Sequence, residues 1–254
     1  MPHFGYCNLS VVPVRETPSD LSQMTTQLLF GDVFLVLERE KNWLRIQNAY
    51  DDYIGWIDAK QQLPIDEETF HRHSNAMFTN RLQGDLYFDS EKLTLVPASS
   101  FQSAEVFRVG KSEIVPSLPL VSVSTPKIDE IKDIAIDYLN APYLWGGKTP
   151  FGIDCSGFTQ SVYKMAGLRL YRDASQQAMQ GNSIHFISEA KCGDLIFFDN
   201  AEGKIVHVGI FVGEGKIIHA SGKVRIDSID HQGIFNEETK SYSHSLRLIK
   251  TFAL

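Results

Sequence analysis

The amino-acid sequence predicts an α+β domain in the second half of the chain, preceded by all-β modules in the first half. Through roughly the first 120 residues, short apolar runs alternate with polar and glycine-containing turns, a pattern typical of small β barrels. After residue 126, two segments carry apolar residues at helical spacing, and apolar, β-rich runs follow from residue 195 onward. Helices followed by a run of strands are characteristic of the α+β class.

The first half contains a stronger and a weaker set of expected strands. The stronger set has four runs, each bounded by polar or glycine turns: 11–15, 33–37, 42–47 and 51–57. The weaker set has three: 86–88, 93–97 and 104–109. A proline-containing stretch over 116–126 has the composition of a linker. We therefore expect three domains, with the boundaries 1–63, 64–119 and 120–254.

The second half begins with two expected helices. Thr125 is a candidate N-cap, Pro126 suits the first helical position, and apolar residues recur at helical spacing over 127–139. A second helix is predicted over 155–166, ending at Gly167. Glycine turns then separate three apolar runs that we expect to form antiparallel strands: 195–198, 206–212 and 216–220.

Charge and composition exclude several classes of function. The 254 residues carry a formal net charge of −7, which argues against a general nucleic-acid binder and against a protein held to anionic membranes by a basic surface. No apolar run approaches the roughly 20 residues that span a bilayer, so no membrane insertion is expected. The N-terminus shows no signal-peptide pattern, so a cytoplasmic location is predicted. Three cysteines without a CxxC pair, and no glycine-rich phosphate loop, predict neither a metal nor a cofactor.

Cys155 is the sharpest chemical feature of the sequence. It stands within Asp154-Cys155-Ser156-Gly157-Phe158, at the predicted start of a helix, where unsatisfied backbone N–H groups stabilise a thiolate. A cysteine is more often an inert core residue, but the polar neighbours Asp154 and Ser156 are unusual for a core position. We therefore predict a reactive thiol here.

Two histidines are candidate partners for this thiol. His207 and His219 each interrupt an apolar, strand-like run, and because strand side chains alternate between faces, each imidazole can point away from its apolar neighbours. A cysteine nucleophile needs a base, and the base needs an orienting group. A single strand histidine is more often a core residue, but two of them after a helix-start cysteine favour catalysis.

Together these motifs resemble the NlpC family of bacterial cell-wall cysteine peptidases. Five segments carry the resemblance in order: 142–147, 154–158, 193–198, 207–211 and 218–221. It covers about 126–254 and implies a papain-like catalytic domain. The first half further resembles the two SH3-like barrels of the YkfC-like γ-D-glutamyl-diamino acid endopeptidases.

The resemblance implies a role for each matching residue. Cys155 would be the nucleophile, His207 the general base and acid, and His219 the group that orients His207. Six further residues would bind the oxyanion or the substrate: Tyr143, Trp145, Asp154, Ser156, Asp173 and Tyr53. Two positions depart from the subgroup pattern, since Ala174 stands in place of a small hydroxyl residue and Gln23 in place of an acid that would meet the substrate amine.

The implied reaction is hydrolysis of the amide bond between D-Glu and the diamino acid of peptidoglycan stem peptides. The expected partners are free peptidoglycan-derived peptides with an N-terminal L-Ala, as in cell-wall recycling, and a monomer is expected. Two alternatives stay open at this point: a wall amidase or acyltransferase on the same fold, and a non-catalytic wall-binding protein. The sequence also leaves open which diamino acid is bound and whether L-Ala is required.

Overall fold

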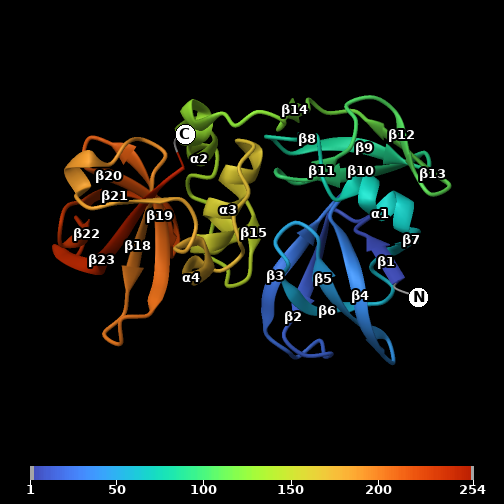
Figure 1. Cartoon of the computed structure of the whole chain (residues 1–254), viewed down its shortest axis with the longest axis horizontal. Helices are drawn as coiled ribbons and strands as arrows, with labels where there is room; N and C mark the ends of the chain where they lie inside the picture. Colours follow the sequence, from blue (N-terminus) through green and yellow to red (C-terminus); the bar gives the residue numbers. More distant parts are fainter. Residues whose placement is uncertain (1–2, 253–254) are drawn as a thin grey trace. The chain divides into compact units, whose positions relative to one another are not determined.

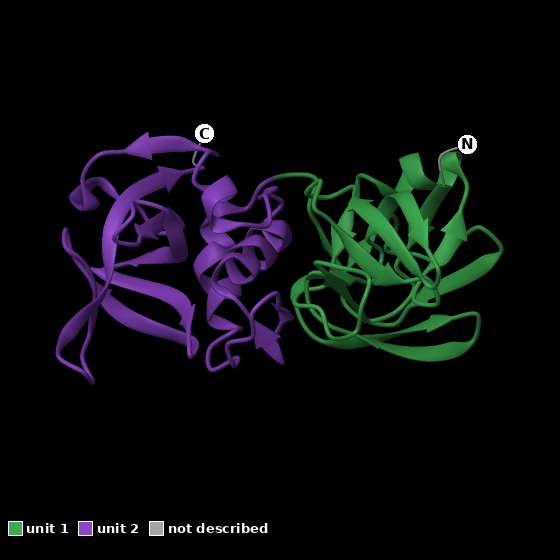
Figure 2. Ribbon diagram, turned by 90° about the horizontal axis from the view of Figure 1, so that it is seen from below, with its two compact units in different colours: residues 1–125 green, residues 126–254 purple. Residues whose placement is uncertain are grey.

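The structure, a computed structural model that describes residues 3–252, divides into two units, residues 1–125 and residues 126–254 (Figure 2). Each unit contains its own sheets, and each is described here by itself. Within the described residues, no helix is long and apolar enough to cross a membrane.

The first unit begins with a seven-stranded antiparallel sheet in the order β3-β2-β6-β5-β4-β1-β7 (Figure 1). Its strands are β1 His3–Tyr6, β2 Val11–Arg15, β3 Met24–Leu29, β4 Val33–Glu40, β5 Trp43–Asn48, β6 Ile54–Asp58 and β7 Leu63–Ile65. Alternation fixes which face is inside: Val12 and Val14 are buried, whereas their neighbours on β2 are partly exposed. All four runs of the stronger set are strands in the structure, while β1, β3 and β7 were not predicted.

One helix and two smaller sheets complete the first unit. The elements are α1 Glu67–His73, β8 Phe78–Thr79, β9 Gly84–Phe88, β10 Glu91–Leu95, β11 Ser100–Phe101, β12 Phe107–Val109, β13 Ser112–Pro116 and β14 Val121–Ser122. Helix α1 begins after Asp66, whose carboxylate accepts a hydrogen bond from the Thr69 backbone N–H at 2.8 Å. The sheet orders are β10-β9-β13-β12 and β11-β8-β14. Strand β14 lies inside the stretch that the sequence predicted as a linker.

The two parts of the first unit share one hydrophobic core. Tyr6 and Phe30 of the first part pack in the same cluster as Leu86 and Phe101 of the second. The backbones of the two parts approach closely at Gly31, whose φ is +87°. A Cβ at this position would lie only 1.8 Å from the Ser100 carbonyl oxygen, so only glycine fits. The predicted boundary between residues 63 and 64 therefore falls within a continuously packed unit, and its division into two domains stays a prediction.

The helices of the second unit differ in part from the predicted ones. They are a 3₁₀ turn at Ile128–Glu130, α2 Ile131–Ile136, α3 Cys155–Met165, α4 Ala174–Gln177 and a second 3₁₀ turn at Ile187–Glu189. Helix α3 confirms the prediction over 155–166. The single helix predicted over 127–139 is wrong in extent, and Thr125 does not cap it. The Lys127 N–H donates instead to the Ala166 carbonyl at the end of α3 (2.8 Å), and Tyr138 closes a tight turn onto Ala135 (3.1 Å).

A closed antiparallel barrel forms the rest of the second unit. Its strands are β18 Leu195–Asp199, β19 Ile205–Gly213, β20 Lys216–Ser221, β21 Lys223–Ile229, β22 Gly233–Asn236 and β23 Ser241–Thr251. They pair in sequence order, and β23 pairs with β22 on one side and β18 on the other, which closes the sheet. Strand β17 Asn182–Ile184 pairs antiparallel with the last residues of β23, and a short hairpin of β15 Lys148–Thr149 and β16 Gly152–Ile153 precedes α3. The three runs predicted at 195–198, 206–212 and 216–220 are confirmed as β18, β19 and β20.

Helix α3 packs against the barrel and brings its N-terminus to the strands that carry the histidines. All of its residues are buried, and it contacts β19 and β20. The inside of the barrel has a separate apolar cluster, which includes Phe198, Phe211, Ile217, Ile229 and Ile249.

Candidate active site

Cys155 is the first residue of α3, and Asp154 before it is the N-cap. The Asp154 backbone is extended (φ −94°, ψ 175°), and its carboxylate accepts a hydrogen bond from the Gly157 N–H at 2.7 Å. The thiol is close to the barrel, because the backbone N–H of Val208, like that of Ser156, is near enough to favour the ionised form of the thiol. Val208 directly follows His207, so this contact places Cys155 beside the backbone of the predicted base.

Burial controls the ionisation of this thiol. Cys155 is 7% exposed, and burial, with the Asp154 carboxylate adding to it, raises the pKa of the thiol to about 12. The Val208 and Ser156 N–H groups and the Arg172 guanidinium oppose this rise without cancelling it. The site therefore holds a protonated thiol at neutral pH, in contrast to the thiolate expected from the helix start alone.

His207 and His219 form a hydrogen-bonded chain that ends on a carboxylate. His207 Nε2 lies 2.8 Å from His219 Nδ1, and His219 Nε2 lies 2.9 Å from Asp227 Oδ2. All three side chains are buried. Burial, and then the neighbouring imidazoles, lower the pKa of His207 well below its usual value, so this ring is neutral at pH 7.

Arg225 fixes the far end of this chain. Its Nη2 donates to Asp227 Oδ1 at 2.9 Å, and its Nε lies 2.9 Å from Asp227 Oδ2. Burial favours the neutral acid, but the hydrogen bonds from His219 and Arg225 outweigh it and lower the pKa of Asp227. Sequence reasoning missed both residues. The available signal was an acidic residue, Asp227, two positions before Ile229 in the β-rich run 223–229.

A third imidazole, from β23, also belongs to the cluster. The His244 ring stacks on His207 with centroids 4.2 Å apart and planes inclined by 24°. Burial, followed by the charge of His219, lowers the pKa of His244 to about 4, so it too is neutral at pH 7. Only barrel closure brings β23 to this place. Over residues 3–252, no group of three or more His, Cys, Asp and Glu side chains is arranged to hold a metal ion.

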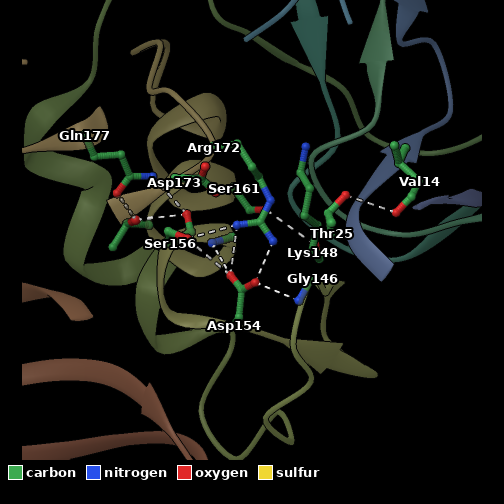
Figure 3. Close-up of polar contacts among 12 residues, drawn as sticks. Val14, Thr25, Gly146, Lys148, Asp154, Ser156, Ser161, Arg172, Asp173 and Gln177 are labelled. Atoms are coloured by element: carbon green, nitrogen blue, oxygen red, sulfur yellow. Dashed lines mark hydrogen bonds and ion pairs between the residues drawn. The ribbon is translucent and has the colours of Figure 1, made fainter. Parts of the chain in front are cut away.

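A buried ion pair supports the loop before α3 (Figure 3). Arg172 Nη1 donates to Asp154 Oδ1 at 3.0 Å and to Ser156 Oγ at 2.9 Å, and Arg172 Nη2 donates to Asp154 Oδ2 at 2.6 Å. The same carboxylate also accepts from the Gly146 N–H at 2.8 Å. Gln177 adds a further link, because its Nε2 donates to the Ser156 carbonyl at 3.0 Å. Asp154 and Ser156 are thus held firmly around Cys155.

The other predicted binding residues lie in different settings. Tyr143 is partly exposed, and burial, with the charges of Cys155 and Asp154, raises its pKa to about 12, so its hydroxyl keeps its proton near the thiol. Trp145 lies on the same loop and is largely exposed. Asp173 is the N-cap of α4, where it forms a capping box with Gln176. Tyr53 belongs to the first unit.

This arrangement is suited to acyl transfer through sulfur. It combines a buried thiol, a neutral imidazole on the strand whose backbone lies near that thiol, and backbone N–H groups at a helix start that can bind an oxyanion.

Comparison with known proteins finds one family match in each half of the chain. The NlpC/P60 family matches residues 140–242, and the bacterial dipeptidyl-peptidase SH3 domain matches residues 14–61. A gamma-D-glutamyl-L-lysine dipeptidyl-peptidase of Bacillus subtilis (strain 168) is 35% identical over 217 residues, which cover 77% of this chain and 71% of the relative. A protein of the same name from Bacillus cereus is 25% identical over 262 residues, covering 86% of this chain and 74% of the relative.

A solved structure has the same fold along nearly the whole chain. The crystal structure of an NlpC/P60 family protein from Bacillus cereus ATCC 10987 aligns with a TM-score of 0.78 at 20% identity, covering 98% of this chain and 99% of the other. The resemblance predicted from the motifs is confirmed, and so is the expected enzyme class. The chain belongs to the NlpC/P60 family of cysteine peptidases and carries a bacterial dipeptidyl-peptidase SH3 domain in its first unit.

Proposed function

We propose that the chain hydrolyses the amide bond between the γ-carboxyl of D-Glu and the diamino acid in peptidoglycan stem peptides. The names of two relatives, each a gamma-D-glutamyl-L-lysine dipeptidyl-peptidase, support this bond and this class of substrate. The observation that carries the proposal is the buried set of Cys155, His207 and His219, in which the thiol lies near the backbone N–H of Val208, the residue after His207, and His207 Nε2 lies 2.8 Å from His219 Nδ1.

The catalytic cycle begins with a neutral pair. Cys155 Sγ attacks the γ-carbonyl carbon while its proton moves to His207 Nδ1, the ring nitrogen not bonded to His219. The tetrahedral intermediate then breaks the C–N bond, and the His207 imidazolium gives the proton to the departing amine. A thioester on Cys155 remains.

Water completes the reaction. His207 removes a proton from a water molecule as its oxygen adds to the thioester carbonyl, and collapse of this intermediate returns a proton to sulfur and releases the γ-carboxylate. The Ser156 N–H at the start of α3 and the protonated Tyr143 hydroxyl are the donors available for the oxyanion in both steps. His219 holds His207 in place.

The substrate we propose is a free muropeptide that begins with L-Ala, as in cell-wall recycling in the cytoplasm. The word dipeptidyl-peptidase in the names of three relatives describes release of a dipeptide from a free N-terminus, which supports this choice. Asp154, Ser156, Asp173, Trp145 and Tyr53 remain our candidates for binding the peptide. The proposal includes a papain-like catalytic domain over 120–254, SH3-like modules over 1–63 and 64–119, and a monomer.

Mass spectrometry of the products tests the reaction. The enzyme is incubated with L-Ala-γ-D-Glu-L-Lys, with its N-acetylated form and with intact sacculi, and Cys155→Ala serves as the control. We expect L-Ala-D-Glu and free L-Lys from the first substrate and no turnover by the variant. The N-acetylated peptide should be cleaved about 10⁴-fold more slowly, because the polar group that binds the free amine is then left without its ligand. Cleavage between sugar and peptide would establish an amidase instead, a product of higher mass an acyltransferase, and unchanged peptides a binding protein.

A further inference from the structure

We propose that Asp227 is a positioning residue that sets the proton-bearing nitrogens of His219 and His207, with Arg225 holding the carboxylate in the orientation this requires. The inference rests on the proposed role of His207 as the base, and it concerns a group that does not contact the substrate. It follows from donor and acceptor roles along the chain of three buried side chains.

The derivation starts at the carboxylate end. An ionised carboxylate only accepts hydrogen bonds, so the nitrogen of His219 that faces Asp227 Oδ2 at 2.9 Å must carry a proton. In a neutral imidazole the other nitrogen, Nδ1 of His219, then has a free lone pair. Nδ1 lies 2.8 Å from His207 Nε2, so His207 donates across this contact.

The consequence appears at the reacting end of the chain. His207 is neutral, and with its proton on Nε2 its Nδ1 has a lone pair. That is the protonation state in which His207 can accept the proton of Cys155. The opposite tautomer would present an N–H to the thiol and could not act as a base.

Arg225 makes the carboxylate end asymmetric. Its Nη2 donates to Oδ1 at 2.9 Å, whereas its Nε lies 2.9 Å from Oδ2 without making a hydrogen bond to it, and His219 is the hydrogen-bond partner of Oδ2. In an Asp227→Asn variant, the carbonyl oxygen of the amide would therefore turn to Arg225, and its NH₂ group would face His219 Nε2. The NH₂ group is a donor, so it would force both imidazoles into the opposite tautomer.

Among the residues that the structure describes, no other charged or titratable group near Asp227, His219 and His207 fixes which ring nitrogens carry the protons. His244 stacks on His207 face to face, and the ring contact of Phe198 is apolar. Glu238 reaches only Arg225, at 3.5 Å. The tautomers of His219 and His207 are therefore determined by Asp227.

Three variants and a matched control test the inference by steady-state kinetics. We expect Asp227→Asn to lower kcat at least 100-fold with little change in KM, because loss of the orienting carboxylate in a directly bonded triad costs about 10⁴-fold. Arg225→Met alone should cost less than tenfold. The double variant should be at least tenfold faster than Asp227→Asn, because without Arg225 the amide can turn its oxygen to His219. Glu238→Gln, the control, should match the wild type.

The pH profile separates positioning from a structural defect. The kcat of Asp227→Asn should keep rising up to pH 10, because the small thiolate fraction of a thiol with a pKa of about 12 grows with pH and reacts without a base, and it should not level off as the wild type does. A kcat within threefold of the wild type, or additive losses in the double variant, would overturn the inference.

A spectroscopic measurement removes the dependence on a substrate. In ¹⁵N-histidine-labelled Cys155→Ala protein, the ring-nitrogen shifts should place the His207 proton on Nε2, and Asp227→Asn in the same background should move it to Nδ1. Unchanged shifts would refute the inference even if the enzyme cleaves the proposed bond. A change would support it even if the substrate proves to be different.

Discussion

Arg172 offers the most direct test of how the site is built. It is 1% exposed, it contacts both oxygens of Asp154, whose side chain is 8% exposed, and it also donates to Ser156. Arg172→Met keeps much of the volume but leaves the Asp154 carboxylate buried without its counter-ion. Removing one partner of a buried pair costs about 3–5 kcal/mol.

The surroundings of Asp154 place the cost at the lower end of that range. Two backbone N–H groups, those of Gly146 and Gly157, continue to hydrogen-bond the carboxylate at 2.8 and 2.7 Å. We therefore expect a loss of about 3 kcal/mol in the unfolding free energy of the second unit. For a unit of roughly 130 residues this corresponds to a fall in Tm of about 10 °C.

A double-mutant cycle combines Arg172→Met with Asp154→Asn, a variant that removes the buried negative charge. Asparagine is as good an N-cap as aspartate, so Asp154→Asn keeps the bond from Gly157. Because no carboxylate then remains, Arg172→Met in that background should cost less than about 1 kcal/mol, giving a coupling energy of about 2 kcal/mol. An exposed pair in the same unit, Lys204 with Glu202 at 2.8 Å, supplies the control, and Lys204→Met should change stability by less than about 0.5 kcal/mol.

Urea unfolding followed by hydrogen-exchange mass spectrometry measures these changes unit by unit. Peptides from α3 and β19 report on the second unit, and peptides from β2 to β6 should stay unchanged. A loss below about 1 kcal/mol for Arg172→Met, or additive losses in the double variant, would refute the view that Asp154 depends on this partner.

Three further outcomes follow from the site and from the first unit. His219→Ala should lower kcat less than His207→Ala does, because the former orients and the latter transfers the proton, and equal losses in steady-state assays would merge the two roles. Because burial raises the pKa of Cys155 to about 12, its labelling by iodoacetamide should keep accelerating above pH 9 and stay slower than that of exposed Cys192, whereas a plateau below pH 7 would establish a thiolate. Burial, and then the charge of Arg72, lower the pKa of His73 to about 4, so the unfolded chain binds more protons below pH 6.5. The stability of the first unit should therefore fall from pH 6.5 to about 4, by up to about 1.4 kcal/mol per pH unit. Urea midpoints measured at pH 7, 5.5 and 4.5 should fall less steeply with decreasing pH in His73→Gln than in the wild type. In His71→Gln, which replaces an exposed side chain, the fall should equal that of the wild type. An unchanged fall in His73→Gln would contradict the assignment.

The parts of the fold that were predictable are those with a local cause. Helix α3 was predictable because apolar residues from Phe158 onward repeat at helical spacing and Gly167 ends the pattern. The expected helix over 127–139 was wrong in extent because the chain starts there as a 3₁₀ turn and leaves the α-helix after Ile136, where Tyr138 and Leu139 form tight turns onto Ala135 and Ile136 (3.1 and 3.0 Å), which the apolar spacing does not reveal. Strand β3 was missed because its Thr-Thr-Gln centre lacks a clear apolar alternation.

The site divides in the same way. Cys155, Asp154 and Ser156 are adjacent in sequence, and His207 and His219 stand out as polar residues inside apolar runs. Asp227 and His244 join them only through strand register and through the pairing of β23 with β18, since β23 follows β18 by some 40 residues. Arg172 reaches Asp154 across 18 positions of the chain.

The position of β23 also sets the order in which the enzyme can become active during synthesis. This strand pairs with β18 and β22 and supplies His244, and its residues 241–251 are translated after all the other strands of the barrel. Until they leave the ribosome, the barrel has two open edges and the His207 ring lacks its stacking contact with His244. A nascent chain stalled before residue 241 should therefore bear a translated Cys155, His207 and His219 and still be inactive towards stem peptides. Adding a synthetic peptide with the sequence of β23 to such stalled chains should restore turnover if closure of the barrel is the step that is missing.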